Sequence, residues 1–263
     1  MDRITSRQNP VVTEFRDAAR GDVEGVMLLD GEHLIQEALA SGIQLRLVAA
    51  AERSAQSAVV RQVEQAGARV ILVTDPVLSA ISPVQSPSGM VALAARPGGR
   101  LEDVFARKPQ LVVMLYGVQD PGNVGAIARA AEGCGATGLV CSERTADPFG
   151  WKALRGAMGS TLRLPTAAKQ SLRAAIAHAR AEGLRVFATD ARGGVMLPEC
   201  DLRKPAAIIL GGEGAGLPAD LIEAADTRVT IPMQPPVESL NVAVAAALVL
   251  YEAARQRATS RVP

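Results

Sequence analysis

Cysteine and histidine are scarce in this chain, which has three cysteines and two histidines among 263 residues. Cys134, Cys141 and Cys200 form no C-x-x-C pair, and His33 and His178 add no ligand at a zinc-binding spacing. We therefore expect no metal site. The odd number of cysteines and the lack of a secretory segment are typical of free, mostly buried thiols in a reducing compartment.

Aromatic residues are also few, at 3% of the chain, which argues against a sheet of stacking aromatics that binds single-stranded nucleic acid. No apolar run is long enough to cross a bilayer, since the uncharged stretch Val242 to Tyr251 has about half of the ~20 residues required. Residues Met1 to Leu28 carry too many charges for a signal peptide. The sequence therefore predicts a cytoplasmic protein without a membrane partner.

Strand-like and helix-like apolar periodicities alternate along almost the whole chain, which is typical of α/β layers. The length suits two domains, and Arg96-Pro97-Gly98-Gly99-Arg100 has the composition of a linker. We expect residues 1–97 to form a compact αβ sandwich. We expect residues 98–263 to form a mostly parallel sheet with helices on both faces, including a strand at residues 161–164.

Basic residues are concentrated in one part of a chain whose formal net charge is only +1. Residues 144–180 contain one acidic residue, Asp147, and seven basic ones: Arg144, Lys152, Arg155, Arg163, Lys169, Arg173 and Arg180. Such a patch attracts phosphate groups, or it is an ordinary solvated face. Charge alone does not separate the two interpretations.

The pattern G-x-G-x-x-G occurs at Gly133, Gly135 and Gly138, but it follows a predicted helix and leads into a predicted strand. A dinucleotide-binding fingerprint has the reverse order, in which the phosphates meet a helix N-terminus. We therefore interpret these glycines as the end of a helix and the turn after it. A P-loop pattern, G-x-x-x-x-G-K-[ST], is absent from the sequence.

Three predicted strands are followed by loops rich in glycine, proline or small polar residues. The first loop, Asp120-Pro-Gly-Asn-Val-Gly125, opens a helix that carries Arg129 among small residues. Asn123 suits the N-cap of this helix. Arg129 either pairs with Glu132 or donates hydrogen bonds to a phosphate or ribose.

The second loop, Gly211 to Gly216, has four glycines in six residues, which indicates backbone packed against a ligand or another segment. Its only charge is Glu213, which is a helix-capping group or a ligand contact. The third loop, Ile231 to Asn241, includes Ser239, which suits the N-cap of the last helix. In an open parallel sheet such loops converge on one crevice.

These three loops resemble the signature motifs of the SpoU (TrmH) family of RNA ribose 2′-O-methyltransferases. The matching stretches are Asp120-Pro-Gly-Asn-Val-Gly with Arg129, Leu210-Gly-Gly-Glu-Gly-Ala-Gly-Leu217, and Ile231-Pro-Met233 with Glu238-Ser-Leu-Asn241. Lys152 to Pro165 resembles the basic stretch of the family, so the resemblance spans about residues 100–260. The sequence departs from the family at Gly212, where the family often has asparagine.

The first 97 residues resemble the N-terminal substrate-binding domain of the family, which has a ribosomal-protein-like αβα fold. The matching pieces are Ile4-Thr-Ser-Arg-Gln-Asn-Pro10 and Leu28-Leu-Asp-Gly-Glu-His-Leu34. The resemblance also implies an obligate homodimer. It implies that the second domain is a trefoil-knotted methyltransferase domain, in which the chain from Gly211 to Leu240 is threaded to form the cofactor pocket.

By this resemblance the cofactor is S-adenosylmethionine, and the residues expected to bind it are Leu210, Gly211, Gly216, Ile231, Met233 and Leu240. The expected catalytic residues are Asn123, Arg129, Glu213, Ser239 and Asn241. The residues expected to bind RNA are Arg7, Asn9, Lys152 and Arg155.

The resemblance implies methyl transfer to a ribose 2′-hydroxyl of RNA, and the N-terminal domain favours 23S ribosomal RNA as the substrate. Transfer RNA is the alternative substrate. A non-catalytic RNA-binding assembly factor with the same fold is a second alternative, which the presence of the motif residues Asn123, Arg129, Glu213 and Asn241 opposes. A nucleotide-dependent oxidoreductase is a third, disfavoured by the misplaced glycine pattern.

Overall fold

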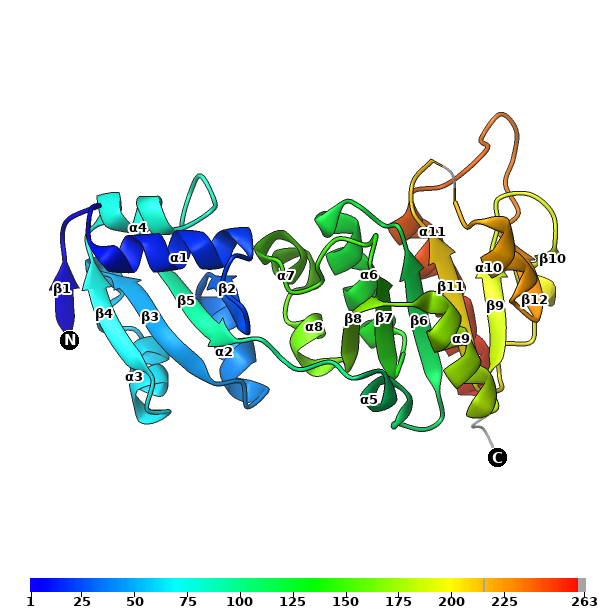
Figure 1. The fold of residues 1–263 in the computed structure, drawn as a ribbon, viewed down its shortest axis with the longest axis horizontal. Helices are drawn as coiled ribbons and strands as arrows, with labels where there is room; N and C mark the ends of the chain where they lie inside the picture. Colours follow the sequence, from blue (N-terminus) through cyan, green and yellow to red (C-terminus); the bar gives the residue numbers. More distant parts are fainter. Residues whose placement is uncertain (215, 260–263) are drawn as a thin grey trace. The chain divides into compact units, whose positions relative to one another are not determined.

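The computed structural model describes residues 1–214 and 216–259 and divides the chain into two compact units (Figure 1). Unit 1 comprises Met1–Pro97 and Phe149–Arg163, and unit 2 comprises Gly98–Pro148 and Leu164–Pro263. Ala215 of the glycine-rich loop lies outside the described residues. Each unit has an apolar core of its own.

Unit 1 is built on a five-stranded sheet with the strand order β1-β4-β3-β5-β2. The strands are β1 (Asp2–Ile4), β2 (Val26–Asp30), β3 (Leu45–Ala51), β4 (Arg69–Val73) and β5 (Met90–Ala95). Strand β5 runs antiparallel to β2 and β3, whereas β4 is parallel to β1 and β3. The helices are α1 (Pro10–Arg20), α2 (Glu32–Ala40), α3 (Ala58–Gln65) and α4 (Asp75–Ile81), and a 3₁₀ turn, η1 (Glu52–Ser54), follows β3.

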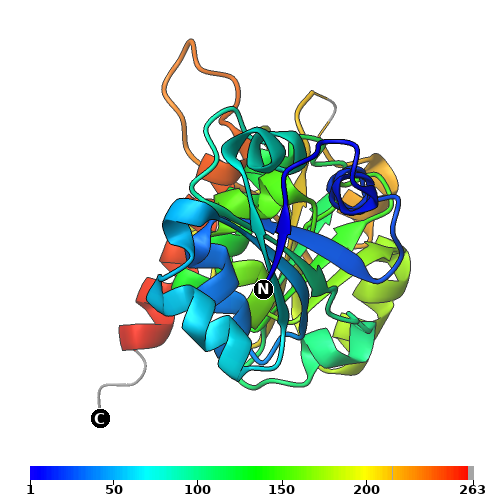
Figure 2. The same ribbon diagram turned by 90° about the vertical axis from the view of Figure 1, so that its left-hand side faces the viewer.

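Helices cover both faces of this sheet (Figure 2). Side chains alternate along each strand, so Leu28 and Leu93 face α1 and α4, whereas Leu29 and Ala92 face α2 and α3. Phe15 of α1 is fully buried in the first of these two cores. The three layers confirm the αβ sandwich expected for the first part of the chain.

Unit 1 also contains two helices from the middle of the chain, α7 (Trp151–Ala157) and α8 (Ser160–Arg163). Phe149, Leu154 and Leu162 are buried in the core that α2 and α3 cover. From the sequence, this segment is expected in the second domain, residues 98–263. The units differ from that division here, because these apolar side chains complete the core of unit 1.

The strand expected at residues 161–164 is wrong. Residues 161–163 lie in α8, and the strand begins only after Pro165, as β8 (Thr166–Gln170) of unit 2. β-branched Thr161 and apolar Leu162 favoured a strand, but both are buried within one helical turn. Pro165 then ends this turn, since the residue before a proline disfavours the helical conformation.

Unit 2 is built on a seven-stranded sheet with the order β10-β12-β9-β11-β6-β7-β8, in which each strand is parallel to its neighbours. The strands besides β8 are β6 (Leu111–Tyr116), β7 (Gly138–Ser142), β9 (Arg185–Thr189), β10 (Val195–Met196), β11 (Ala206–Gly211) and β12 (Thr227–Thr230). The helices are α5 (Leu101–Phe105), α6 (Pro121–Gly133), α9 (Leu172–Ala181), α10 (Ala219–Glu223) and α11 (Val242–Thr259), with a 3₁₀ turn, η2 (Leu197–Glu199). This architecture confirms the fold class expected for the second part of the chain.

The sheet of unit 2 has a topological switch point between β6 and β11. From β6 the chain adds β7 and β8 on one side, and α9 then leads it back to β9 on the other side. Helices α5, α9 and α10 cover Met114 and Ile209 on one face, while α6 and α11 pack against each other on the opposite face (Figure 1). Ligands of open parallel sheets bind outside the carboxyl ends of the strands at such a point. The ends of β6 and β11 therefore mark the candidate site.

Helix α1 of unit 1 begins with a side-chain cap. The Oδ1 atom of Asn9 accepts a hydrogen bond from the Val11 backbone N–H at 3.0 Å, and Pro10 occupies the first helical position. The Nε atom of Arg7 donates to the carbonyl of Pro76 at 3.0 Å. Arg7 and Asn9, the two N-terminal residues expected to bind RNA, therefore each form a side-chain hydrogen bond with the backbone of unit 1.

We expect Asn9→Ala to lower the free energy of unfolding by about 1 kcal/mol, because it leaves a helix-terminal N–H without its partner. Asn9→Asp keeps an acceptor in the same place and should change that free energy by no more than about 0.3 kcal/mol. Urea unfolding followed by circular dichroism measures both variants. Equal unfolding midpoints for the wild type and Asn9→Ala would show that this cap contributes nothing.

Candidate active site

Helix α6 starts directly after β6, and its first turn is capped by Asp120. The Asp120 Oδ1 accepts a hydrogen bond from the Asn123 backbone N–H at 2.9 Å. The sequence analysis expected Asn123 to be this cap, which is wrong because Asp120 lies at the N-cap position, three residues earlier. The amide side chain of Asn123 is therefore available for other contacts.

Asn123 is hydrogen-bonded to residues from both of the other motif loops. Its Nδ2 donates to Oε1 of Glu213, in the loop after β11. Its Oδ1 accepts a hydrogen bond from Nδ2 of Asn241 at 3.2 Å. The structure thus brings together three residues separated by 90 and 118 positions in the sequence. The expected convergence of the three loops on one crevice is confirmed for these residues.

The direction of this hydrogen-bond chain is set by the last helix. The Oδ1 of Asn241 accepts from the backbone N–H groups of Ala243 at 2.9 Å and Val244 at 3.3 Å, so Asn241 caps α11. Because its oxygen is engaged by the helix, the Nδ2 of Asn241 points to Asn123, whose own Nδ2 then faces Glu213. The expectation that Ser239 caps this helix is wrong, since Asn241 performs that role.

Arg129 lies two turns further along α6 and is exposed. Within the described part of the chain its guanidinium makes no hydrogen bond or ion pair, and the expected alternative of a pair with Glu132 is not formed. Five N–H donors of a permanently charged group are therefore free for a ligand.

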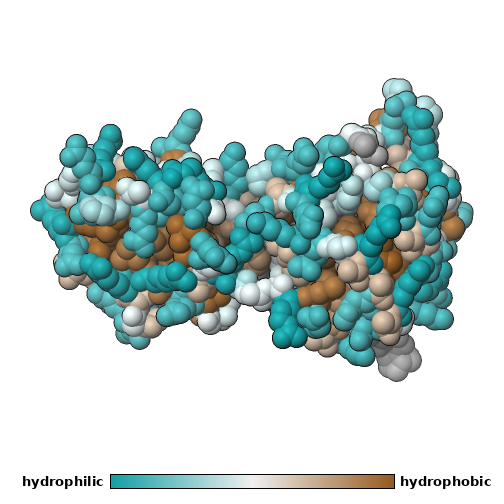
Figure 3. Space-filling view, in the orientation of Figure 1, coloured by the Kyte–Doolittle hydropathy of each residue, from teal (hydrophilic) through white to brown (hydrophobic). Residues whose placement is uncertain are grey.

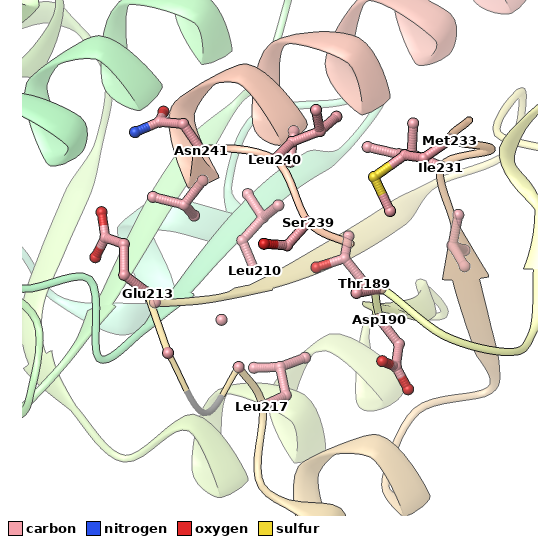
Figure 4. A pocket seen from close by; sticks show the side chains of 18 residues that line it. Thr189, Asp190, Leu210, Glu213, Leu217, Ile231, Met233, Ser239, Leu240 and Asn241 are labelled. Atoms are coloured by element: carbon pink, nitrogen blue, oxygen red, sulfur yellow. The ribbon is translucent and has the colours of Figure 1, made fainter. Parts of the chain in front are cut away.

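A cavity of about 430 Å³ opens beside this hydrogen-bond chain. Its apolar wall includes Leu210, Leu217, Ile231, Met233 and Leu240, and all six residues expected to bind the cofactor line it: Leu210, Gly211, Gly216, Ile231, Met233 and Leu240. Glu213 and Asn241 lie at one end of the cavity, with Met233 and Ile231 at the other (Figure 4). Ser239 also lines it, so this expected catalytic residue lies close to the expected cofactor site.

Several residues of the cavity wall were not expected from the sequence; the two polar ones are Thr189, the last residue of β9, and Asp190, which follows it. Thr189 donates through Oγ1 to the carbonyl of Ile209 at 3.0 Å. Asp190 forms an ion pair with Arg228 at 3.4 Å. Both residues could have been predicted from the rule that ligands bind at the carboxyl ends of strands. Thr189 ends a predicted strand, Asp190 follows it, and a Gly-Gly pair comes shortly afterwards.

The glycine-rich loop is explained by close approach of backbone to backbone. A Cβ atom on Gly211 would lie 2.5 Å from the carbonyl carbon of Gly216, and one on Gly212 would lie 2.0 Å from the carbonyl oxygen of Gly117. The backbone N–H of Gly212 also donates to the carbonyl of Tyr116 at 2.8 Å. The departure from the family at Gly212 therefore coincides with a place where no side chain fits.

The basic residues Lys152 and Arg155 belong to α7 of unit 1, and both are exposed. The Nζ of Lys152 lies 5.4 Å from the ring centroid of Trp151. The side chain of Arg155 makes no hydrogen bond or ion pair with another described residue. The structure thus places all four residues expected to bind RNA, Arg7 and Asn9 included, in unit 1 and the expected catalytic residues in unit 2.

The cysteines do not form a reactive centre. Cys141 and Cys200 are buried and Cys134 is half-buried, and burial raises the pKa of all three thiols. Among residues 1–214 and 216–259, no group of three or more histidine, cysteine, aspartate or glutamate side chains could hold a metal ion.

No helix in the described ranges is long and apolar enough to cross a membrane. The face of the protein drawn in Figure 3 carries mainly hydrophilic residues, with apolar residues in separate patches between them.

Both halves of the chain match known families. Residues 110–251 match the SpoU rRNA Methylase family, and residues 16–92 match the MRM3-like substrate binding domain. An uncharacterized tRNA/rRNA methyltransferase of Synechocystis is 34% identical over 99% of this chain and 96% of its own length. The 23S rRNA (guanosine(2553)-2′-O)-methyltransferase RlmP of Bacillus subtilis is 34% identical over 95% of this chain and 98% of its own.

Solved structures agree with these relatives. The AdoMet-bound rRNA methyltransferase of Sinorhizobium meliloti has a TM-score of 0.87 and 30% sequence identity, with 97% of each chain covered. The SpoU methyltransferase AviRb of Streptomyces viridochromogenes, in complex with AdoMet, has a TM-score of 0.85 and 27% identity over 96% of this chain and 99% of its own. The resemblance seen in the sequence motifs is confirmed: the chain belongs to the SpoU rRNA methylase family.

Proposed function

We propose that this RNA methyltransferase transfers a methyl group from S-adenosylmethionine to a ribose 2′-hydroxyl of 23S ribosomal RNA. The hydrogen-bond chain from Asn241 through Asn123 to Glu213, two of whose residues line the 430 Å³ cavity, is the observation that carries the proposal. The substrate comes from the relative RlmP, which is named as a 23S rRNA methyltransferase. A ribosomal RNA substrate implies that the protein acts in the cytoplasm.

The cavity suits S-adenosylmethionine in size and in chemistry. About 430 Å³ lies within the range of small-molecule sites. The apolar wall of Leu210, Ile231, Met233 and Leu240 fits an adenine ring, and the backbone at Gly211 and Gly216, which no Cβ covers, can read its edge. Glu213, Ser239 and Asn241 supply polar groups in the cavity wall. When bound, S-adenosylmethionine supplies an electrophilic methyl group on its sulfonium.

The residues at the mouth of the cavity orient the ribose hydroxyl and take up its proton. The Oε1 of Glu213 is held by Asn123, while the other carboxylate oxygen makes no hydrogen bond to another described residue and is free to accept a proton. The guanidinium of Arg129 binds an RNA phosphate and stabilises the negative charge that develops on the attacking oxygen. Orientation of the two reactants provides much of the acceleration in such a transfer.

Unit 1 is proposed to bind the RNA. Residues 16–92 match a substrate binding domain, and Lys152 and Arg155 of α7 present exposed positive charge on the same unit. Arg7 and Asn9 stay proposed RNA contacts, although both also make hydrogen bonds within unit 1.

A trefoil knot between residues 211 and 240 and a homodimer are also proposed. The absence of room for a Cβ at Gly211 and Gly212 supports a segment threaded close to other backbone. A second copy of the chain fits the apolar stripe on α11, where Val244, Leu248 and Tyr251 are 49%, 41% and 65% exposed at helical spacing. Such a stripe can pair with itself across a two-fold axis.

A direct test is methylation of 23S ribosomal RNA by the purified chain. We expect label from methyl-labelled S-adenosylmethionine to appear at one ribose, where primer extension at low nucleotide concentration then stops. Labelling of transfer RNA in place of 23S ribosomal RNA would contradict the proposed substrate. Binding of S-adenosylmethionine without labelling of any RNA would contradict methyl transfer itself.

We expect Gly211→Ala to abolish binding of S-adenosylmethionine, because its Cβ would overlap the backbone at Gly216 and force the loop out of the cavity wall. Gly133→Ala is the matched control, since a Cβ at Gly133 meets no atom within 4 Å. Calorimetric titration compares the two variants. Unchanged affinity of Gly211→Ala would show that the loop is not part of the cofactor site.

Arg129→Ala is expected to reduce methyl transfer at least about 100-fold, as for loss of a group that stabilises developing charge. The affinity for S-adenosylmethionine should change by no more than about threefold, because Arg129 does not line the cavity. Single-turnover kinetics and calorimetry measure the two effects. Wild-type turnover by Arg129→Ala would contradict its catalytic role.

Leu248→Asp is expected to shift the protein from dimer to monomer, because it places a charge within the apolar stripe on α11. Val195→Asp, at a residue of similar exposure on β10, should leave the dimer intact. Sedimentation velocity separates the two states. A wild-type chain that sediments as a monomer would contradict the proposed dimer.

A further inference from the structure

Unit 1 contains a second cavity, of about 400 Å³, at the carboxyl end of β2. Its wall combines residues from the start of α2, the loop before β5 and helix α7, among them Asp30, His33, Ser88, Arg155 and Met158. All of these residues belong to unit 1, so the cavity is complete within it.

The carboxylate of Asp30 is held in one orientation. Its Oδ2 accepts a hydrogen bond from Oγ of Ser82 at 2.6 Å, and that hydroxyl accepts from the Val84 backbone N–H at 3.2 Å. The hydroxyl proton of Ser82 therefore points at Asp30, which leaves Oδ1 as an acceptor without a partner among the described residues. Asp30 is half-buried, and burial raises the pKa of its carboxyl group, while Ser82 and the positive charge of Arg155 lower it.

Arg155 lines the same cavity but forms no ion pair with Asp30 or with any other described residue. Arg155 is exposed and keeps its hydration, whereas the half-buried carboxylate of Asp30 is partly desolvated and has no cation hydrogen-bonded to it among the described residues. The wall thus presents free acceptors, on Asp30 and on the second carboxylate Glu32, together with the free donors of Arg155. A ligand that offers donors beside acceptors satisfies both groups.

The backbone around the cavity is shaped to keep it open. Gly31 adopts φ +101°, and a Cβ there would lie 2.9 Å from the Oγ of Ser88. Met158 is the C-cap residue that follows α7, and it has φ +50°, a left-handed conformation in which its backbone N–H donates to the carbonyls of Leu154 and Arg155. Met158 is 41% exposed, and it lines the cavity. Met158 and His33 give the cavity flat and polarisable walls suited to an aromatic ring.

We propose that this cavity binds a guanine base of the RNA. The inference rests on the proposed function only in taking RNA as the ligand. Sequence-specific RNA recognition works on unstacked bases, whose Watson–Crick and Hoogsteen edges are read by side chains. The N1–H and N2–H groups of guanine are adjacent donors for the carboxylate of Asp30, where Oδ1 is free and Oδ2 keeps a second lone pair beside the one that Ser82 uses. Its O6 and N7 are adjacent acceptors for the guanidinium of Arg155.

The other bases satisfy this pair of side chains less well. Uracil has its single N3–H donor between two carbonyl oxygens, which repel a carboxylate. Adenine and cytosine each offer one exocyclic amino group to Asp30 and place an acceptor nitrogen beside it. Guanine alone presents two donors side by side, so Asp30 selects for it.

The test is binding of short RNAs to the full chain. The probes are uridine hexamers that carry one central guanosine, inosine or adenosine, titrated by fluorescence anisotropy at a fixed salt concentration. We expect the wild type to bind the guanosine probe about tenfold more tightly than the adenosine probe, as for one good bidentate contact. Inosine, which lacks the N2 amino group, should fall between the two.

Asp30→Asn keeps an oxygen that accepts from Ser82 but replaces the free carboxylate oxygen with an amino group, which donates. The affinity for the guanosine probe should then equal that for the adenosine probe. Lys152→Gln is the matched control. It removes a charge from α7, the helix that carries Arg155, at a position that does not line the cavity. This variant should lower the affinity for all three probes by the same factor and keep the preference for guanosine. Circular dichroism of both variants confirms their fold.

Two results would overturn the inference: equal binding of the three probes by the wild type, or an unchanged preference for guanosine in Asp30→Asn. Calorimetry of the same wild-type preparation with S-adenosylmethionine keeps the two proposals separate. Cofactor binding without a preference for guanosine rejects the base pocket alone. A preference for guanosine without cofactor binding rejects the proposed methyl transfer and leaves the base pocket standing.

Discussion

The close passage of backbone past backbone at the end of β11 is the constraint on which the rest of the site depends. Gly211 meets the chain at Gly216 and Leu217, and Gly212 meets it at Gly117, at distances that leave no room for a Cβ. The first contact shapes the wall of the cavity. The second packs the loop against the backbone directly after β6, in the segment that leads to α6. Both contacts are made by backbone and position the backbone before Glu213, whose exposed side chain is held by the hydrogen bond from Asn123.

Helix capping is a second constraint, and it determines the direction in which the polar side chains of the site point. Asp120 takes the cap of α6, which releases the amide of Asn123. Asn241 takes the cap of α11 with its oxygen, which turns its amino group toward Asn123. The two caps together leave one direction for the hydrogen-bond chain, ending on the carboxylate of Glu213. The same backbone N–H groups that must be satisfied for the helices to form thus orient the groups proposed for catalysis.

Much of this could be predicted from the sequence, and the failures have physical causes. The layered fold and the convergence of the loops follow from apolar periodicity and from the rule for strand ends. The caps were assigned to Asn123 and Ser239 because Asp, Asn and Ser have similar capping preferences, and spacing alone does not choose between neighbours. The helix α8 was mistaken for a strand because its burial, not its local propensity, decides its conformation. Arg155 and Asp30 are 125 positions apart, so no local pattern could have indicated their common cavity.

The placement of residues 149–163 links the two proposed tasks through the covalent chain. These residues lie between β7 and β8 of the sheet in unit 2, yet Phe149, Leu154 and Leu162 are buried in the core of unit 1. The chain therefore passes from one unit to the other three times, and the linker at residues 96–100 is only one of the connections. A chain that began at Gly98 would leave the three apolar side chains without their core. Arg155 would likewise lose Asp30 and the rest of its cavity. The segment that supplies the proposed base contact is thus itself folded by the unit that supplies the remainder of the pocket.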